Sequence, residues 1–283
     1  MNDGVMACGV VAHVPTLSRA EITPKYQNTL VEGERRLGKR LRALKPDLLV
    51  VISTHWVSTF NWFTTLHESH RGICVAEEAP DLIPGIPYDY KGDPEFASAL
   101  LNEWTNRGIP CQENKTAHYS WDYGTYVPLS HLDPESEIPV VSIPVVLMAN
   151  LEECFDAGSA IVKIAQHQKK RVVVLASSAF SHALVRGREH WPRDDRLKLD
   201  QSVIEQLKRG DIDQVIDGFE DYSKRSVVEM GGRAIATMLG AASLMKQHLP
   251  DCRGMTFGDY AQSSGSGNVN IVLASSQVLD QLK

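Results

Sequence analysis

Short, wholly apolar runs alternate along this chain with longer stretches in which apolar residues recur every three or four positions. The run at residues 171–177 (RVVVLAS) is typical of a strand that is buried on both faces. The stretch at residues 24–44, with leucines along one face, is typical of an amphipathic helix. Because such strands need helices on both sides, the alternation predicts a layered α/β fold with a central mixed sheet flanked by helices.

The same patterns place the individual elements. We expect strands at residues 6–12, 47–53, 62–66, 72–76, 138–146, 171–177, 255–260 and 268–274. We expect helices at residues 24–44, 94–107, 151–168, 197–209, 212–220 and 229–248. Two prolines in residues 138–146 indicate an edge strand or a broken ladder, and Asp93 suits the N-cap of the helix that follows it. Because the sequence has no repeat and no obvious linker, we expect residues 1–283 to form one domain, with the loop-rich segment 57–121 capping the site.

The composition excludes several classes of protein. The chain is 43% hydrophobic and 23% charged, which is typical of a globular protein, and its net charge of −6 argues against nucleic acid or an anionic membrane as the main partner. No apolar run approaches the roughly 18–20 residues that span a bilayer, and the first residues do not resemble a signal peptide. Five scattered cysteines without a CxxC pair indicate reduced thiols, and hence a cytoplasmic protein.

Three histidines follow predicted buried strands closely. They are His13 in VVAHVP, His55 in VISTHW and His182 in VLASSAFSH. In α/β folds, ligands bind at the carboxyl ends of the strands, which is where each of these histidines is expected. A single histidine in such a place is more often structural, but three together favour a shared site. Neutral imidazoles from neighbouring strands are suitable ligands for iron, zinc, copper or nickel.

A carboxylate would complete such a metal site, and the best candidate is Glu229 in SVVEMGGR. It lies at the expected start of the helix at residues 229–248, where the helix dipole would stabilise its charge. The simpler interpretation is a solvated glutamate in a first helical turn. Two histidines and one carboxylate leave coordination positions open, as in non-haem Fe(II) sites that bind substrate and O2 together. The same ligands also bind zinc.

Two further segments are candidates for lining this site. Residues 121–125 (WDYGT) combine aromatic, acidic and flexible residues, so they either pack around a turn or place the Tyr123 hydroxyl beside a metal. Residues 263–268 (SSGSGN) lack the lysine and the helix of a P-loop, which favours a tight turn or a close backbone approach. A serine hydrolase is disfavoured because the chain has no GxSxG motif.

With these segments in view, the chain resembles the class III extradiol ring-cleavage dioxygenases, the superfamily of the protocatechuate 4,5-dioxygenase catalytic subunit. The resemblance runs from one end of the chain to the other, and the segments follow the family's order: HVP, KPDLLVVISTHW, WDYGTYVPL, VVVLASSAFSH, VVEMGGRAIATMLG and SSGSGNVN. Because of the DYGT and SSGSGNVN segments, the chain is most similar to the homoprotocatechuate 2,3-dioxygenase and 2-aminophenol 1,6-dioxygenase branches.

The resemblance implies a role for each candidate residue. It makes His13, His55 and Glu229 the ligands of an Fe(II) cofactor, and it makes His182 the acid–base histidine. Tyr123 matches the tyrosine of the two most similar branches, where the protocatechuate branch carries a histidine. His118 is given a secondary catalytic role, since some relatives have a serine at that position.

The resemblance also implies a reaction, in which O2 cleaves a catecholic ring beside its diol to give a muconic semialdehyde, in the degradation of aromatic compounds. His182 would take a proton from the substrate hydroxyl and return it later, and Tyr123 would hydrogen-bond the reacting oxygens. A homoprotocatechuate-like substrate is favoured. Its carboxylate would need a basic partner, for which Arg186, Arg188 and Arg233 are candidates.

Several alternatives stay open at this point. The chain could be a 2-aminophenol-type 1,6-dioxygenase subunit, a non-catalytic subunit of a heteromeric dioxygenase, or a zinc-binding protein of the same fold. A non-catalytic subunit would lack a metal ligand, and no ligand position is altered here. The native metal could also be zinc or manganese. Besides a small aromatic substrate and O2, the expected partners are copies of the same chain or a related subunit.

Overall fold

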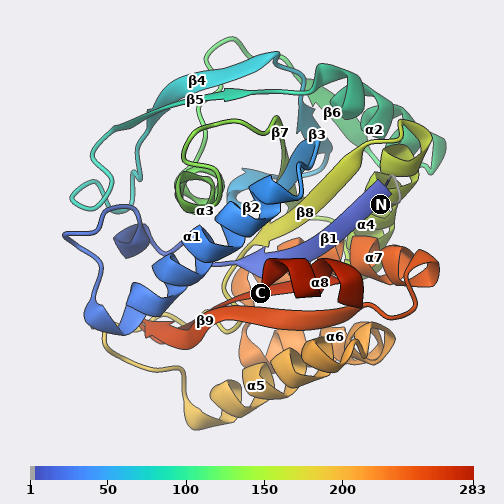
Figure 1. The fold of residues 1–283 in the computed structure, drawn as a ribbon. Coiled ribbons are helices and arrows are strands. Elements are labelled where there is room, and N and C mark those ends of the chain that lie inside the picture. Colours follow the sequence, from blue (N-terminus) through green and yellow to red (C-terminus); the bar gives the residue numbers. More distant parts are fainter. Residues whose placement is uncertain (1–3) are drawn as a thin grey trace.

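A six-stranded sheet forms the centre of the molecule, in the order β7-β2-β8-β1-β10-β9 (Figure 1). The computed structural model describes residues 4–283. The strands of this sheet are β1 (Gly4–Val11), β2 (Leu48–Ser58), β7 (Val140–Val146), β8 (Arg171–Ser177), β9 (Arg253–Ser263) and β10 (Ser266–Ala274). Strands β7, β2, β8 and β1 run parallel, whereas β10 and β9 each run antiparallel to their neighbours. The sheet is therefore mixed, as the sequence predicts.

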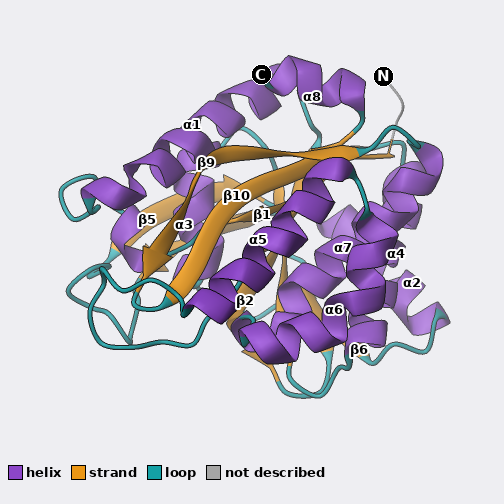
Figure 2. Ribbon diagram, turned by 90° about the horizontal axis from the view of Figure 1, so that it is seen from below, coloured by secondary structure: helices purple, strands orange, loops and turns teal. Residues whose placement is uncertain are grey.

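Helices cover both faces of this sheet, which confirms the predicted layered arrangement. Figure 2 shows α1 (Asn28–Ala43) and α8 (Ser276–Leu282) on one side, and the helices from α4 to α7 on the other. The helix α3 (Tyr123–Leu132) shares the core of the first side. The second side carries α2 (Pro94–Asn106), α4 (Leu151–His167), α5 (Asp194–Arg209), α6 (Ile212–Ser226) and α7 (Arg233–His248).

Alternate residues of each central strand point into opposite cores. In β2, Leu48, Val50 and Ile52 belong to the core under α4 and α7, whereas Leu49 and Val51 belong to the core under α1. Side chains of a strand alternate between the two faces, so a strand that is covered on both faces must be apolar throughout. This alternation explains the wholly apolar runs of the sequence.

The structure confirms the predicted N-cap of α2 and the predicted edge position of β7. Asp93 caps α2 by accepting a hydrogen bond from the amide of Phe96 at 3.0 Å, as expected. Strand β7, which contains Pro144, lies at an edge of the central sheet. Segment 57–121 is less loop-rich than predicted, because it contains α2 and two small sheets that pair β3 (Trp62–Thr65) with β6 (Cys111–Asn114) and β4 (Ser69–Cys74) with β5 (Ile86–Lys91).

The predicted helix at residues 229–248 is wrong at its start. Helix α7 begins at Arg233, and Glu229 lies before it in a short 3-10 turn, η3 (Glu229–Gly232). Met230, Gly231 and Gly232 have φ angles of 47°, 65° and 79°, so the chain reverses in the left-handed region that glycine adopts without steric cost. Glu229 is thus outside the helix, and the helix dipole does not explain its position.

Smaller differences concern helix length. The helix expected from residue 24 begins at Asn28, after a 3-10 turn, η2 (Lys25–Gln27). Helices α5 and α6 are longer than predicted, and α3 and α8 were not expected. Nearly every residue of α3 is buried, so it lacks the periodic pattern by which an amphipathic helix is detected. Within residues 4–283, no helix is both long and apolar enough to cross a membrane.

Two glycines let α4 and α7 pack unusually close. A Cβ atom added at Gly158 of α4 would lie 1.7 Å from the carbonyl oxygen of Thr237, and one added at Gly240 of α7 would lie 1.9 Å from that of Phe155. Each helix therefore carries a glycine where the backbone of the other passes. Contacts this short with backbone atoms can be relieved only by separating the helices.

We expect Gly158→Ala and Gly240→Ala each to lower the free energy of unfolding by about 1–3 kcal/mol, because an overpacked contact is destabilising. The matched control is Gly218→Ala in α6, where an added Cβ meets nothing within 4 Å. That control is expected to gain up to about 1 kcal/mol from helix propensity. Urea unfolding of the three variants measures the difference. Equal stability of Gly158→Ala and Gly218→Ala would contradict the close helix contact.

Candidate metal centre

The strand order of the sheet brings the three histidines to one edge. Strand β8 lies between β1 and β2, and all three run in the same direction, so their carboxyl ends meet. His13 lies two residues beyond β1, and His182 lies five residues beyond β8. His55 lies near the carboxyl end of β2. Residues that are far apart in sequence thus face a common space.

A bulge in β2 releases His55 from the sheet. Ser53 pairs with Pro144 of β7, and the next pair along the ladder is Val57 with Val145, so residues 54–56 have no partners on β7. Proline has no amide hydrogen, which weakens the ladder at this place. A bulge commonly re-aims a side chain next to a functional site. Here it frees the segment that carries His55.

Three ligating side chains converge at this edge. The Nε2 atoms of His13 and His55 are 3.1 Å apart. The Oε1 atom of Glu229 lies 3.4 Å from Nε2 of His13 and 3.6 Å from Nε2 of His55. The possible ligand atoms of these three residues all lie within 4.8 Å of one another. Glu229 is 3% exposed and His13 is 5% exposed, so these two are shielded from water, whereas the side chain of His55 is 21% exposed.

These separations fit a bound metal ion. Two ligand atoms about 2.1 Å from one ion lie about 3.0 Å apart when they subtend a right angle, and about 3.4 Å apart in a tetrahedral arrangement. The observed distances of 3.1, 3.4 and 3.6 Å are close to these values. Two imidazoles and one carboxylate suit iron, zinc or manganese, so the donor set fits a divalent transition metal without selecting one.

Glu229 is held by its backbone as well as by its second carboxylate oxygen. Its Oε2 accepts a hydrogen bond from the amide of Ala179 at 2.6 Å. Its own amide donates to the carbonyl of Phe180, and the bridge between Ser181 and Val228 joins the same two segments. The segment after β8 therefore forms the platform on which Glu229 rests, and Oε1 remains available for a metal.

The electrostatics of the cluster favour a charged Glu229 beside a neutral His182. Burial alone would raise the pKa of Glu229, but the neighbouring histidines lower that pKa well below its usual range. Burial lowers the pKa of His182, and the attraction of Glu229 does not offset this effect. For His55, by contrast, burial is outweighed by hydrogen bonding to Glu229, so its pKa is raised. The lowered pKa therefore favours the neutral form of the His182 imidazole at neutral pH.

His182 lies beside the ligand group and is not part of it. Its Nε2 atom is 3.4 Å from Oε1 of Glu229, and its side chain is 30% exposed. The cluster of close ligand atoms contains His13, His55 and Glu229 alone among the residues described. His182 is thus placed to exchange a proton with a molecule that is bound at this cluster.

Tyr123 is fixed by the start of α3. Asp122 caps this helix by accepting a hydrogen bond from the amide of Thr125, and it also accepts one from the hydroxyl of Ser53 in β2. The absence of a side chain at Gly124 permits this approach, because a Cβ there would lie 2.5 Å from Oγ of Ser53. The rings of Tyr123 and His55 are consequently 4.0 Å apart. Burial raises the pKa of Tyr123, so its hydroxyl stays protonated.

A cavity of about 310 Å³ opens onto this cluster. Its size is at the lower end of the roughly 300–1,000 Å³ that is usual for small-molecule sites. The sequence predicts a tight turn or a close backbone approach at residues 263–268, and the hairpin between β9 and β10 places part of this segment in the cavity wall. The wall includes His13, His55, Glu78, Leu82, Tyr123, His182, Leu184, Arg188, Glu229, Ser263, Ser264, Ser266 and Asn268.

Other candidate residues lie elsewhere. His118 is exposed and is not among the residues that line this cavity, so the structure does not bring it to the cluster. Of the three candidate arginines, Arg188 lines the cavity and Arg186 does not. Arg233 donates hydrogen bonds to the carbonyls of Leu147 and Ala149 instead.

The sequence reasoning missed Glu78. This residue follows β4 in a loop that reaches over the cavity, and its Oε1 lies 3.4 Å from Nδ1 of His55. Two adjacent glutamates in a loop have the appearance of solvated surface residues, so no local signal distinguishes Glu78. Glu78 reaches His55 and the cavity only because of the path of this loop.

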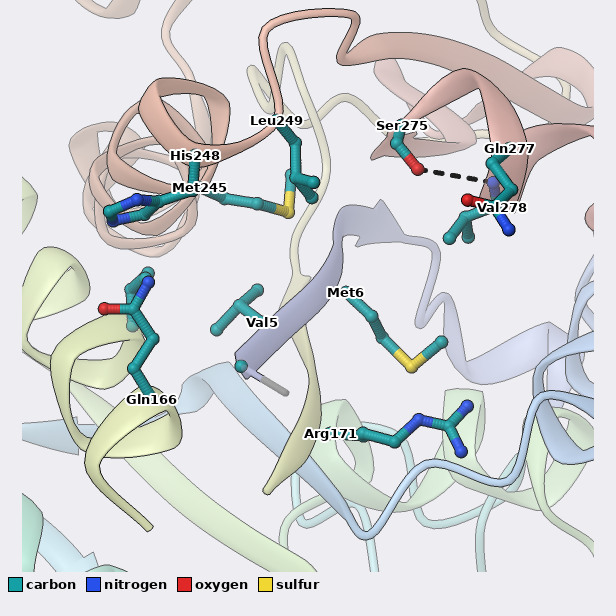
Figure 3. Close-up of a pocket in the computed structure, with 12 residues that line it drawn as sticks. Val5, Met6, Gln166, Arg171, Met245, His248, Leu249, Ser275, Gln277 and Val278 are labelled. Atoms are coloured by element: carbon teal, nitrogen blue, oxygen red, sulfur yellow. Dashed lines mark hydrogen bonds between the residues drawn. The ribbon is translucent and has the colours of Figure 1, made fainter. Parts of the chain in front are cut away.

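A larger cavity of about 710 Å³ lies at the opposite edge of the sheet, at the amino ends of β1 and β8 (Figure 3). Met6, Arg171, Met245 and His248 are among the residues that line it. Among residues 4–283, no group of metal-binding side chains converges there. We therefore assign the candidate metal site to the smaller cavity, which is lined by His13, His55 and Glu229.

Comparison with known proteins connects this geometry to a family. The family model described as "Catalytic LigB subunit of aromatic ring-opening dioxygenase" matches residues 7–273. The chain is 22% identical to a 3,4-dihydroxyphenylacetate 2,3-dioxygenase from Escherichia coli over 223 residues, which cover 75% of this chain and 81% of that protein.

Two further relatives are the subunits of one enzyme from a Pseudomonas species. The chain is 26% identical to the beta subunit of 2-aminophenol 1,6-dioxygenase, with 85% of this chain and 87% of that one covered. It is 23% identical to the alpha subunit, with 82% and 86% covered. Among solved structures, an uncharacterized protein from Escherichia coli K12 has the same fold, with a TM-score of 0.67 and 16% identity over 94% of this chain and 99% of that one.

We expect the chain to bind one divalent metal ion, and the binding to weaken as the pH falls. Metal binding needs neutral imidazoles, and the raised pKa of His55 keeps this residue protonated to a higher pH than usual. Glu229→Gln should weaken binding by roughly 100-fold or more, since it removes a ligand rather than a neighbour of one. Titration calorimetry with Co²⁺ at pH 6, 7 and 8 measures both effects.

The control for this experiment is His118→Ala, which should bind Co²⁺ as the unaltered protein does, because His118 lies outside the cavity. Binding that is independent of pH, or unchanged in Glu229→Gln, would show that the ion binds elsewhere.

Proposed function

Because this chain belongs to the family of the catalytic LigB subunit of aromatic ring-opening dioxygenases, we propose that it cleaves a catecholic ring beside its diol, with Fe(II) as cofactor and O2 as co-substrate. Membership confirms that the chain is an oxidoreductase of the extradiol dioxygenase type, a metal-dependent class of enzyme. The identity of the metal, the substrate and the roles of individual residues belong to the proposal.

One observation carries the proposal: a His-His-carboxylate group lies next to a further histidine, His182, in a small cavity. His13, His55 and Glu229 would hold the metal. When bound, Fe(II) would supply open positions at which the ring oxygens and O2 lie side by side. The alternative of a non-catalytic subunit is disfavoured, since all three ligands are present and close together.

His182 would act as the acid–base residue. Burial lowers its pKa, so the neutral ring can accept a proton from a substrate hydroxyl that is bound beside Glu229. The proton is then held at Nε2, where the Glu229 carboxylate at 3.4 Å stabilises the imidazolium. His182 returns the proton to an oxygen atom later in the reaction.

Tyr123 would supply a second hydrogen bond to the reacting oxygens. Its hydroxyl is protonated because burial raises its pKa, and its ring lies against the ring of His55. A donor that is fixed before the substrate binds needs no reorganisation during the reaction. Tyr123 is therefore assigned to the orientation of the substrate rather than to proton transfer.

The charges of the cavity favour a homoprotocatechuate-like substrate. Arg188 is the one lysine or arginine among the described residues that line the cavity. Its guanidinium is half-exposed and forms an ion pair with Asp81 at 3.8 Å, which is too long for a hydrogen bond, so its N–H groups can donate to a carboxylate on the ring substituent. A 2-aminophenol is the second candidate, because Glu78 offers a carboxylate that an amino group can hydrogen-bond.

The remaining parts of the proposal concern organisation. We assign residues 1–283 to one catalytic domain, since the family match covers nearly the whole chain. Relatives named as alpha and beta subunits support assembly with a second copy or a related subunit. All five cysteines are free, which supports a cytoplasmic protein.

We expect protein loaded with Fe(II) under anaerobic conditions to consume O2 with 3,4-dihydroxyphenylacetate and to form a yellow product. In His182→Gln, turnover should fall by about 100-fold or more, because general acid–base catalysis is lost, while the iron content stays unchanged. An oxygen electrode and metal analysis measure the two quantities. His118→Ala is the control and should retain full turnover. No O2 uptake by the iron-loaded protein with any catechol or aminophenol would refute the proposed function.

Arg188→Gln should raise the KM for 3,4-dihydroxyphenylacetate by about tenfold, the effect of losing one charge-assisted hydrogen bond. The KM for unsubstituted catechol should not change, because catechol carries no carboxylate. Arg186→Gln, which alters a neighbouring arginine outside the cavity wall, is the matched control. A similar KM change for both substrates in Arg188→Gln would show that Arg188 does not recognise the substrate carboxylate. It would then contradict a substrate that carries one.

A further inference from the structure

Asp200, on helix α5, is a fully buried carboxylate outside the cavity wall. None of the lysine and arginine ion pairs within residues 4–283 involves Asp200. Burying a charge without a counter-ion is costly unless hydrogen bonds satisfy it completely. The other buried residues of α5 are Val203, Ile204 and Leu207, which belong to an apolar core. A buried carboxylate on the same helix therefore requires an explanation.

Four donors from different segments satisfy this carboxylate. Its Oδ2 accepts from the amide of Ser181 at 3.0 Å and from the hydroxyl of Tyr260 at 2.6 Å. Its Oδ1 accepts from the hydroxyls of Tyr222 at 2.9 Å and Ser226 at 2.6 Å. Both oxygens are thus used, each by two donors, and the network is closed.

Each carboxylate oxygen of Asp200 binds a different segment of the proposed active site. Ser181 directly precedes His182, so the Oδ2 side fixes the backbone at the acid–base histidine. Ser226 comes three residues before Glu229, so the Oδ1 side fixes the segment that leads to the metal ligand. These segments also pair directly, since the amide of His182 donates to the carbonyl of Val227 at 2.9 Å. Asp200 joins the same two segments through its hydrogen bonds with Ser181 and Ser226.

The glycine of the SGN sequence completes the arrangement. A Cβ atom at Gly267 would lie 1.6 Å from the Tyr260 hydroxyl and 2.7 Å from Oδ2 of Asp200. The amide of Gly267 donates to the carbonyl of Ser181, and its carbonyl accepts from the amide of Phe180. The β9–β10 hairpin can therefore reach both the carboxylate and the segment of His182 only because residue 267 has no side chain.

We propose that Asp200 is a positioning residue that sets the place of His182 relative to Glu229. This inference rests on the proposed function, in which these two residues carry proton transfer and metal binding. Asp200 touches neither the cavity nor the ligand group, so it acts through Ser181 on one side and Ser226 on the other.

The first test is Asp200→Asn. Asparagine has the same size but replaces one acceptor oxygen with an NH2 donor, so two of the four donors lose their acceptor. With saturating Fe(II), kcat should fall about tenfold or more, as is typical when a partner of a catalytic group is removed, while KM changes little. In metal-free protein, the Kd for Co²⁺ should rise severalfold, and the imidazole NMR signals of His182 should shift.

The matched control is Asp133→Asn, another fully buried aspartate, which accepts a hydrogen bond from the amide of Ile138 and lies outside the cavity wall. This variant should also lose stability but should leave kcat, the Kd for Co²⁺ and the His182 signals unchanged. If Asp200→Asn behaves as Asp133→Asn does, with stability alone affected, Asp200 serves only the fold and the proposal is overturned.

Ser226→Ala keeps the test decisive if Asp200→Asn does not fold. It removes one donor on the Glu229 side and leaves the bond to Ser181 in place. The Kd for Co²⁺ should rise, with the His182 signals near their original positions; an unchanged Kd would overturn the proposal. The Co²⁺ and NMR measurements need no turnover, so they judge Asp200 even if the unaltered protein consumes no O2 and the proposed function fails.

Discussion

The buried carboxylate of Glu229 is the interaction on which the rest of this site depends. One of its oxygens faces the ring nitrogens of His13, His55 and His182 at 3.4 to 3.6 Å, and the other is bound by the amide of Ala179. A charge this well buried is stable only beside a cation or several donors. The strand order, the bulge in β2 and the left-handed turn before α7 all serve to bring those partners to it.

Much of the fold could be predicted because the central strands are covered on both faces and so are apolar throughout. Their order in the sheet could not, since pairing depends on contacts across the whole chain. His13, His55 and His182 could be placed at strand ends by simple spacing. The true setting of Glu229 could not, because it depends on glycines 231 and 232 adopting positive φ and on pairing with residues 179–181. Glu78 and Asp200 carry no local signal at all, and their roles arise from what lies next to them in space.

The parallel and antiparallel parts of the sheet make different contributions to the site. The parallel strands β2, β8 and β1 deliver the three histidines to one edge. The antiparallel hairpin of β9 and β10 turns back at the same edge, so that its turn closes the cavity and supports the segment of His182. A sheet that was parallel throughout would have placed a chain crossing at this position instead of a tight turn.

The candidate metal ligands lie far apart along the chain, since His13 follows the first strand and Glu229 precedes the last helix of the α4–α7 layer. During synthesis, a ribosome would therefore release His13 and His55 long before their third partner exists. The nascent chain holds no complete set of these candidate ligands until Glu229 has been added. An ion that is held by all three would therefore stabilise the folded state rather than an early intermediate.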